Sequence, residues 1–382
     1  MRRLTPAAVL LPLGLLLVLA GNALAATNPA ANDAKAAAKP AAWDAEAQAA
    51  AAKYLDQREV WWQNWPRAQK DHGTVCVSCH TQVPYALARP ALRIPLDEQK
   101  PSDPEQAMLN SVLSRVKLGK DAKPFYNDVD NGEGKTVEAT NTESVFNALI
   151  LASYDARAGH LSAPARDAFK AMWANQQQTG PKAGAWVWQN FHYSPWEGDD
   201  SEYFGAVMAA VAVATAPDNY RGDPDGLANI VLLRGYLTRE APKQPVENRM
   251  LLLWASGKLP GLLTRKEQNA ITQEIFDQQQ SDGGWSLETL GTFKRRDDSK
   301  PVIRSDAYAT GLAVLALEES GEGKGTSPVR RGVLWLTANQ DRATGRWPAW
   351  SVNKDRDPAS DIGKFMSDAG SAFAVLALEK SK

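Results

Sequence analysis

The chain has 382 residues and a formal net charge of −1 at pH 7, because 43 lysines and arginines oppose 44 aspartates and glutamates. This balance excludes a basic field of the kind that collects nucleic acid or an anionic membrane surface. Only two cysteines are present, and both lie in one short stretch, "TVCVSCHTQVPYA", at residues 74–86.

The first 25 residues predict a secretory signal. "MRR" is a positive n-region, "AAVLLPLGLLLVLAG" is an apolar stretch, and "ALA" ending at Ala25 is a small-residue cleavage site. No later apolar run is long enough to span a bilayer, so we expect an exported, periplasmic protein with no transmembrane segment in its mature chain. Residues 26–43 are rich in Ala, Pro, Asn and Lys and lack the large apolar side chains of a core, which predicts a linker.

The stretch "CVSCH" at residues 76–80 has three interpretations. A disulfide between Cys76 and Cys79 would close a very small loop, which adds little stability. A zinc site would need two further ligands, and only three other histidines remain in the chain. The third interpretation is covalent attachment of haem c, in which both thiols form thioethers and His80 ligates the iron. The motif and the exported location together favour haem attachment over a structural or redox-active dithiol.

Six nearly all-apolar segments of helical period recur along the chain, most of them opening on a Ser or Thr in the N-cap position. The clearest pair is "SDAYATGLAVLALE" at 305–318 and "SDAGSAFAVLALE" at 367–379. We expect these helices to begin near Thr81, Thr142, Ser201, Val246, Ser305 and Ser367.

Amphipathic helices with more charge are predicted between the apolar ones. Their expected ranges are 44–57, 105–118, 163–178, 224–239, 265–280 and 327–340. Helices that are apolar all round have to be buried, whereas amphipathic helices can face water. The alternation therefore predicts an all-α fold, an (α/α)6 toroid with six inner and six outer helices, that occupies residues 44–382 as one domain.

The junctions from outer to inner helices carry a second repeated signal: a Gln at a helix end, then Gly, one residue and Trp. It occurs in "QQTGPKAGAW" (177–186), "QQSDGGW" (279–285) and "QDRATGRW" (340–347). We expect the Gln amide to satisfy backbone groups at the helix end and the Trp to stack between repeats. These segments resemble the QW repeats of squalene-hopene cyclases and of the wider terpenoid cyclase and prenyltransferase toroids. The resemblance covers nearly all of the chain after the linker.

The Cys76–His80 motif falls in the junction before the first inner helix, so we expect the haem site to be built into repeat one. The resemblance implies that this junction opens at the mouth of the central cavity, with His80 as the proximal iron ligand. Met366 aligns with His80, and ring closure makes repeats six and one neighbours, so Met366 is a candidate sixth ligand. Its ordinary role would be to fill a gap in an apolar wall. His192, in a long loop of repeat three, and an open sixth position are the alternatives.

Acids at the starts of inner helices are candidate catalytic residues at the mouth: Asp199, Asp200, Glu202, Asp306 and Asp368. Each also has an ordinary role as a favourable charge at a helix N-terminus. Together with Glu143, we expect them to form an acidic rim. The catalytic Asp-x-Asp-Asp motif of the cyclases is not matched, because the nearest string, "DVDN" at 128–131, lacks its last aspartate.

These features predict a periplasmic monohaem c-type cytochrome on a squalene-cyclase-like toroid. Its partner would be a redox protein that exchanges electrons with it, or an apolar, terpenoid-like small molecule that it oxidises in the cavity. A Met or His on the iron would favour electron transfer, and an open position would favour chemistry. The alternatives are a non-redox cyclase-like enzyme, a glycan-active toroid enzyme with paired carboxylates, and a binding protein.

Overall fold

Residues 42–126 and 132–382 are described by this computed structural model, and within them the regular secondary structure is helical, with no strand beyond two isolated bridges. The fold class is therefore all-α, as predicted. The predicted signal, nearly all of the linker and the "DVDN" string lie outside the described residues. No helix of the described part is long and apolar enough to cross a membrane.

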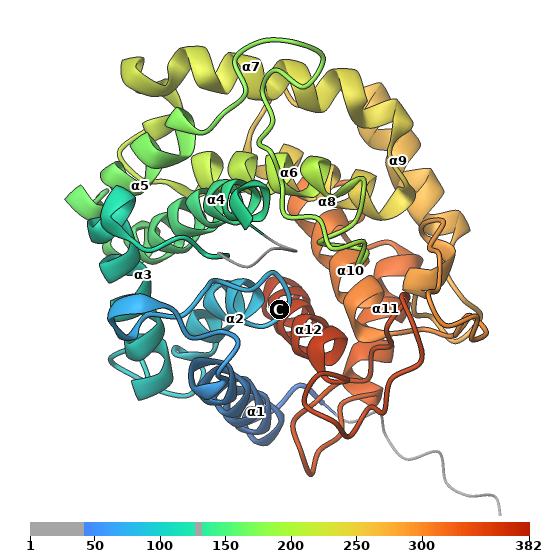
Figure 1. Cartoon of the computed structure of the whole chain (residues 1–382). Helices are drawn as coiled ribbons and strands as arrows, with labels where there is room; N and C mark the ends of the chain where they lie inside the picture. Colours follow the sequence, from blue (N-terminus) through green and yellow to red (C-terminus); the bar gives the residue numbers. More distant parts are fainter. Residues whose placement is uncertain (1–41, 127–131) are drawn as a thin grey trace, which may run out of the picture. The chain divides into compact units, whose positions relative to one another are not determined.

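Six helices of the described part pack on one another in a closed cycle. Most of their residues are buried, except in α4, where the buried stretch is 141–152. Each contacts the next one along the chain, and the last contacts the first, as can be followed in Figure 1. They are α2 (Gln82–Ala88), α4 (Gly132–Ala158), α6 (Ser201–Thr215), α8 (Val246–Lys258), α10 (Ala307–Ser320) and α12 (Phe365–Lys380). Five of these helices begin within two residues of the predicted starts.

Helix α4 is the exception, because it begins at Gly132, ten residues before the predicted start at Thr142. The two glycines at its beginning made this stretch resemble a loop. The helix is nevertheless supported there by an ion pair between Lys135 and Glu138, at 2.7 Å and one turn apart.

Six amphipathic helices of the described part lie outside this cycle, each against at least one buried helix. They are α1 (Ala45–Asn64), α3 (Asp103–Leu118), α5 (Ala163–Ala174), α7 (Pro224–Glu240), α9 (Arg265–Asp277) and α11 (Ser327–Ala338). Polar N-cap side chains start most of them, and Ser102 and Thr264 form complete capping boxes with Glu105 and Glu267. The main difference from prediction is that α1 runs on to Asn64.

The tryptophans of the three Gln-Gly-Trp junctions are buried anchors. Trp186, Trp285 and Trp347 have no exposed surface, and the indole N–H of each donates at 2.7 Å to a backbone carbonyl of the outer helix just before it. Each tryptophan therefore fastens its junction to its own outer helix, with no polar atom left unpaired.

The glutamines of these junctions fasten each repeat to the next one. The Gln279 amide donates at 2.8 Å to the carbonyls of Gly283 and Pro328, the second of which lies at the start of α11. Gln340 makes the equivalent bond across the closing seam, to the Ala47 carbonyl of α1 at 2.9 Å. In the first copy the bridging side chain is Gln176, one residue before the predicted Gln177.

Candidate functional site

The Cys76–His80 segment lies in the loop between α1 and α2, directly before the first buried helix, as the sequence predicts. The indole N–H of Trp62, near the end of α1, donates to the Cys76 carbonyl at 2.9 Å. The Ser78 hydroxyl accepts the backbone N–H of Gln82 at 3.0 Å, which satisfies a free donor at the start of α2. The motif is thus held by the two helices that flank it.

Both thiols of the motif are free and protonated at neutral pH. Burial raises the pKa of the Cys76 thiol to about 11 and that of Cys79 well above its usual range. Redox-active dithiols have the opposite character, with a thiol pKa lowered below the ordinary value of about 8.5. Within residues 42–126 and 132–382, no three His, Cys, Asp or Glu side chains are grouped as metal ligands. The raised thiol pKa values therefore disfavour a redox-active dithiol.

His80 is packed in an aromatic box. Its ring stacks on Phe365 with centroids 3.7 Å apart, and the edge of Trp62 meets it at 5.1 Å. Burial, with smaller contributions from Arg58 and Arg356, lowers the pKa of His80 to about 3. The imidazole is therefore neutral across the physiological range, which is the form that ligates metals.

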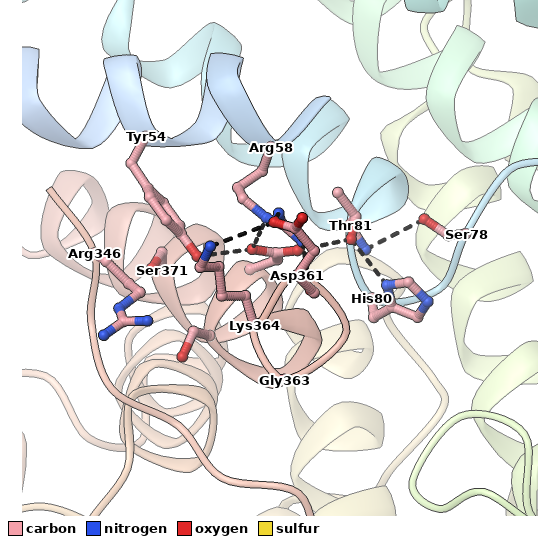
Figure 2. Close-up of polar contacts among 12 residues, drawn as sticks. Tyr54, Arg58, Ser78, His80, Thr81, Arg346, Asp361, Gly363, Lys364 and Ser371 are labelled. Atoms are coloured by element: carbon pink, nitrogen blue, oxygen red, sulfur yellow. Dashed lines mark hydrogen bonds and ion pairs between the residues drawn. The ribbon is translucent and has the colours of Figure 1, made fainter. Parts of the chain in front are cut away.

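A buried hydrogen-bond network fixes the orientation of His80, as Figure 2 shows. Its Nδ1 lies 2.8 Å from the Thr81 hydroxyl oxygen, and that hydroxyl donates to Asp368 Oδ2 at 2.9 Å. Asp368 Oδ1 in turn accepts from the Tyr54 hydroxyl at 2.7 Å and from Arg58 Nε at 2.8 Å. The other ring nitrogen of His80, Nε2, points away from this network.

A cavity of about 840 Å³ opens beside the motif, within the usual size range of small-molecule and cofactor sites. Four junctions line it: those before α2, α4, α6 and α12. Cys76, His80 and Met366 all lie on its wall, among the aromatic side chains of Trp62, Trp65, Trp196 and Phe365. The cavity thus brings together three of the four residues predicted to contact a haem. The fourth, Cys79, is 3% exposed and does not line the cavity.

Four cations lie on the wall of the same cavity: Arg67, Lys70, Lys354 and Arg356. The sequence analysis did not single them out, because they sit in two loops nearly 300 residues apart and form no charge run. They give the cavity a positive edge opposite in sign to the predicted acidic rim. The carboxylates of an organic cofactor or substrate would be stabilised at this edge.

Of the predicted rim acids, Glu143 alone lines this cavity. Asp306 is the buried N-cap of α10, where it accepts the N–H groups of Ala309 and Leu287 at 2.9 and 2.6 Å. Asp199 is exposed, Asp200 lies just before α6, and Glu202 pairs with Lys182 at its surface. The structure therefore does not bring these four acids together at this cavity.

Two predicted acids are instead buried in ion pairs. Asp368 pairs with Arg58 of α1, and Glu143, which does touch the cavity, is held by both ends of the Arg115 guanidinium at 2.5 and 2.9 Å. These contacts join residues far apart in the chain, so helix periodicity does not reveal them. In each case a charge expected at a helix terminus ties neighbouring helices together.

The two candidate sixth ligands are in different surroundings. Met366 is buried, 5% exposed, on the first turn of α12 and on the cavity wall. His192 has an exposed side chain that contacts Asp199 at 2.9 Å, and it is not among the residues that line the cavity. The geometry therefore places Met366, rather than His192, in the same cavity as His80.

Glu197 is a cavity residue that the sequence analysis missed. Its carboxyl group lies on the wall, and burial raises its pKa to about 7, against a smaller opposing effect of Lys135. Glu197 lies next to Trp196 in the loop before α6. In this loop the sequence predicted Asp199 and Asp200 as site residues instead. The only available signal was its place in that long aromatic loop.

Comparison with known proteins does not identify the chain. No protein-family model matches it, and no curated protein is similar enough to count as a relative. Among solved structures, a glycosidase bearing a point substitution is similar over 89% of this chain and 99% of its own, with 12% identity and a TM-score of 0.47. A likeness this distant assigns neither an activity nor a substrate to the chain.

Proposed function

We propose that this chain is an exported, periplasmic monohaem c-type cytochrome that transfers electrons. The observation that carries the proposal is the convergence of Cys76, His80 and Met366 on one cavity with aromatic walls and a cationic edge. A bound haem c would supply a one-electron iron centre at this position. The partner class that follows is a periplasmic redox protein.

The residues present fit such a group. Cys76 and Cys79 would hold the group by two thioethers, for which Cys79, 3% exposed and not part of the cavity lining, has to turn toward the cavity. His80 would offer Nε2, the nitrogen that its hydrogen-bond network leaves free. The cations at the cavity edge match the two propionates that every haem carries.

Met366 favours electron transfer over oxidation of a small molecule, because a second protein ligand would occupy the position that a substrate needs. We expect Met366→Leu, which keeps an apolar side chain, to abolish the weak near-infrared band of Met-to-iron coordination in the oxidised protein. His192→Ala is the control and should leave the spectrum unchanged. An unaltered spectrum in Met366→Leu would show that Met366 does not ligate the iron. Water or a substrate would then occupy the sixth position, and oxidation of a terpenoid-like molecule would become the favoured function.

The fold supports a related proposal, that the chain is an (α/α)6 toroid of the terpenoid cyclase type. Two features support it: the closed cycle of six buried helices, and the bonding pattern repeated at three Gln-Gly-Trp junctions. The haem motif occupies the equivalent junction of the first repeat. In this proposal the toroid lacks the catalytic aspartate of the cyclases, keeps the cavity, and holds a cofactor at the cavity wall.

The decisive experiment concerns covalent attachment. We expect the full chain, expressed with haem c maturation machinery, to keep its haem stain on a denaturing gel. Cys76→Ala or Cys79→Ala should each leave one thioether and shift the absorption spectrum, and the double variant should lose the stain. Covalent haem in the double variant, or none in the unaltered chain, would refute the proposal.

A second candidate function, glycan cleavage, is favoured by one observation. Glu197, whose pKa burial raises to about 7, shares the cavity with Glu143, and glycosidases cleave glycans with a pair of carboxyl groups. Against it, both oxygens of Glu143 are engaged by Arg115. Release of reducing sugars from polysaccharides by the unaltered chain, lost in Glu197→Gln, would establish this activity. The haem proposal expects no such release.

A further inference from the structure

The hydrogen-bond network behind His80 admits only one arrangement of protons. A carboxylate has no proton to give, so all its partners have to donate to it. The Thr81 hydroxyl therefore directs its hydrogen at Asp368 Oδ2, 2.9 Å away, and only its lone pairs remain for His80. The His80 nitrogen that faces those lone pairs at 2.8 Å is Nδ1, which has to carry the ring proton.

Asp368 accepts hydrogen bonds at both carboxylate oxygens in this network. It is 3% exposed, it forms an ion pair with Arg58 Nε at 2.8 Å, and the hydroxyls of Tyr54 and Thr81 donate to it. Arg58 is itself held by the side chain and the backbone carbonyl of Asp361, at 2.9 and 2.8 Å. The carboxylate is thus pinned between α1 and α12 with Oδ2 free for Thr81.

We propose that Asp368, acting through Thr81, is a positioning residue for His80: it holds the imidazole as the Nδ1–H tautomer and makes Nε2 more electron-donating. Partners behind a metal-bound histidine orient its ring and raise its basicity. A more basic ligand stabilises ferric over ferrous iron, so this network lowers the reduction potential of the bound group. The effect on potential rests on the proposed haem function, whereas the tautomer does not.

The test cuts the network between the carboxylate and the imidazole. Thr81→Val is close to isosteric, removes the hydroxyl and leaves the Arg58–Asp368 ion pair in place. In the haem-loaded full chain we expect the one-electron equilibrium to shift toward the reduced form by about tenfold, which is 59 mV. Thr81→Ser restores the hydroxyl and should have the potential of the unaltered protein. If Thr81 had a purely structural role, Thr81→Val would change the stability of the protein, but the reduction potentials of Thr81→Val and Thr81→Ser would not differ.

A second variant should change the reduction potential in the opposite direction, and it tests the inference even if Thr81→Val does not fold. Tyr54→Phe removes one donor from Asp368, which leaves more negative charge on the carboxylate for Thr81. The potential should therefore fall, by less than Thr81→Val raises it. A rise in Tyr54→Phe, or an unchanged potential in a folded Thr81→Val protein, would overturn the inference.

The tautomer is measured separately, by ¹⁵N NMR of the histidine rings in the same full-length proteins. Only four histidines are present, so the His80 signals are assignable with one substitution. We expect Nδ1 to be protonated in the unaltered chain and in Thr81→Ser, and its proton to exchange faster with water in Thr81→Val. If the unaltered chain carries no haem, the proposed function fails, and the NMR spectrum still decides the inference. A mixture of His80 tautomers in the unaltered chain would overturn it.

Discussion

Replacing Gly345 by alanine is expected to lower the free energy of unfolding by roughly 2 to 5 kcal/mol. Gly345 has a φ of +77°, a conformation that L-residues adopt at a cost of about 1 to 2 kcal/mol. It also lies against α1, where an added Cβ would overlap the backbone carbonyl of Ala50. Because a backbone cannot move aside as a side chain does, the seam between the last repeat and α1 would have to open.

Gly321→Ala is the matched control for this substitution. Gly321, after α10, has the same φ of +77°, but nothing lies within 4 Å of the position that its Cβ would take. Gly321→Ala should lower the free energy of unfolding only by the conformational penalty, about 1 to 2 kcal/mol. Urea unfolding of both variants, followed by circular dichroism, measures the difference. Equal losses of stability would show that the close approach at the seam is unimportant.

Glu247→Gln is expected to gain stability over the unaltered protein as the pH rises. Glu247 is 2% exposed on the first turn of α8, and its only side-chain hydrogen bond is from the Tyr308 hydroxyl, at 2.8 Å. Burial, with a smaller contribution from Asp200, raises the pKa of Glu247 from 4.5 to about 8. The folded state therefore holds this proton more tightly than the unfolded state does.

The sign of the pH dependence follows from that difference. The contribution of the Glu247 proton to the free energy of unfolding is fully present below pH 4.5. It is lost as the pH rises toward 8, by roughly 4 to 5 kcal/mol in total. Glutamine cannot ionise, so the difference between variant and unaltered protein should grow by about 1.4 kcal/mol per pH unit in this range. Urea unfolding at pH 5, 6, 7 and 8 measures it. Glu46→Gln, on the exposed first turn of α1, is the control, and a difference that stays constant with pH would contradict the prediction.

The helical framework was predictable because its signals are local. Apolar periodicity and N-cap residues placed most helices within a few residues, and the Gln-Gly-Trp repeats marked three junctions with their anchoring bonds. Helix α4 was predicted too short because Gly132 and Gly134 resemble a loop, whereas the helix is stabilised there by a side-chain pair. The rule that paired glycines mark a loop failed here because the stabilising Lys135–Glu138 pair was not considered.

The candidate site was predictable only in part. The motif indicated Cys76, Cys79 and His80, and the repeat alignment indicated Met366; three of these four residues line one cavity, and Cys79 does not. The buried ion pairs of Glu143 and Asp368 were not predicted, because a carboxylate at a helix start looks the same in sequence whether it faces water or a buried arginine. Arg58 and Asp368 are 310 positions apart, and periodicity carries no information about such pairs.

The closing seam has a topological consequence. The indole N–H of Trp43 donates to the Glu379 carboxylate at 2.7 Å, and Arg342 of the last junction pairs with Asp44 at 3.0 Å. The beginning and the end of the packed helices are therefore neighbours, and every buried helix has two partners irrespective of where the chain is cut. A circular permutant joined from Lys382 to Trp43 by a short peptide, and opened at the exposed turn after Gly159, would retain every helix pairing of the natural order.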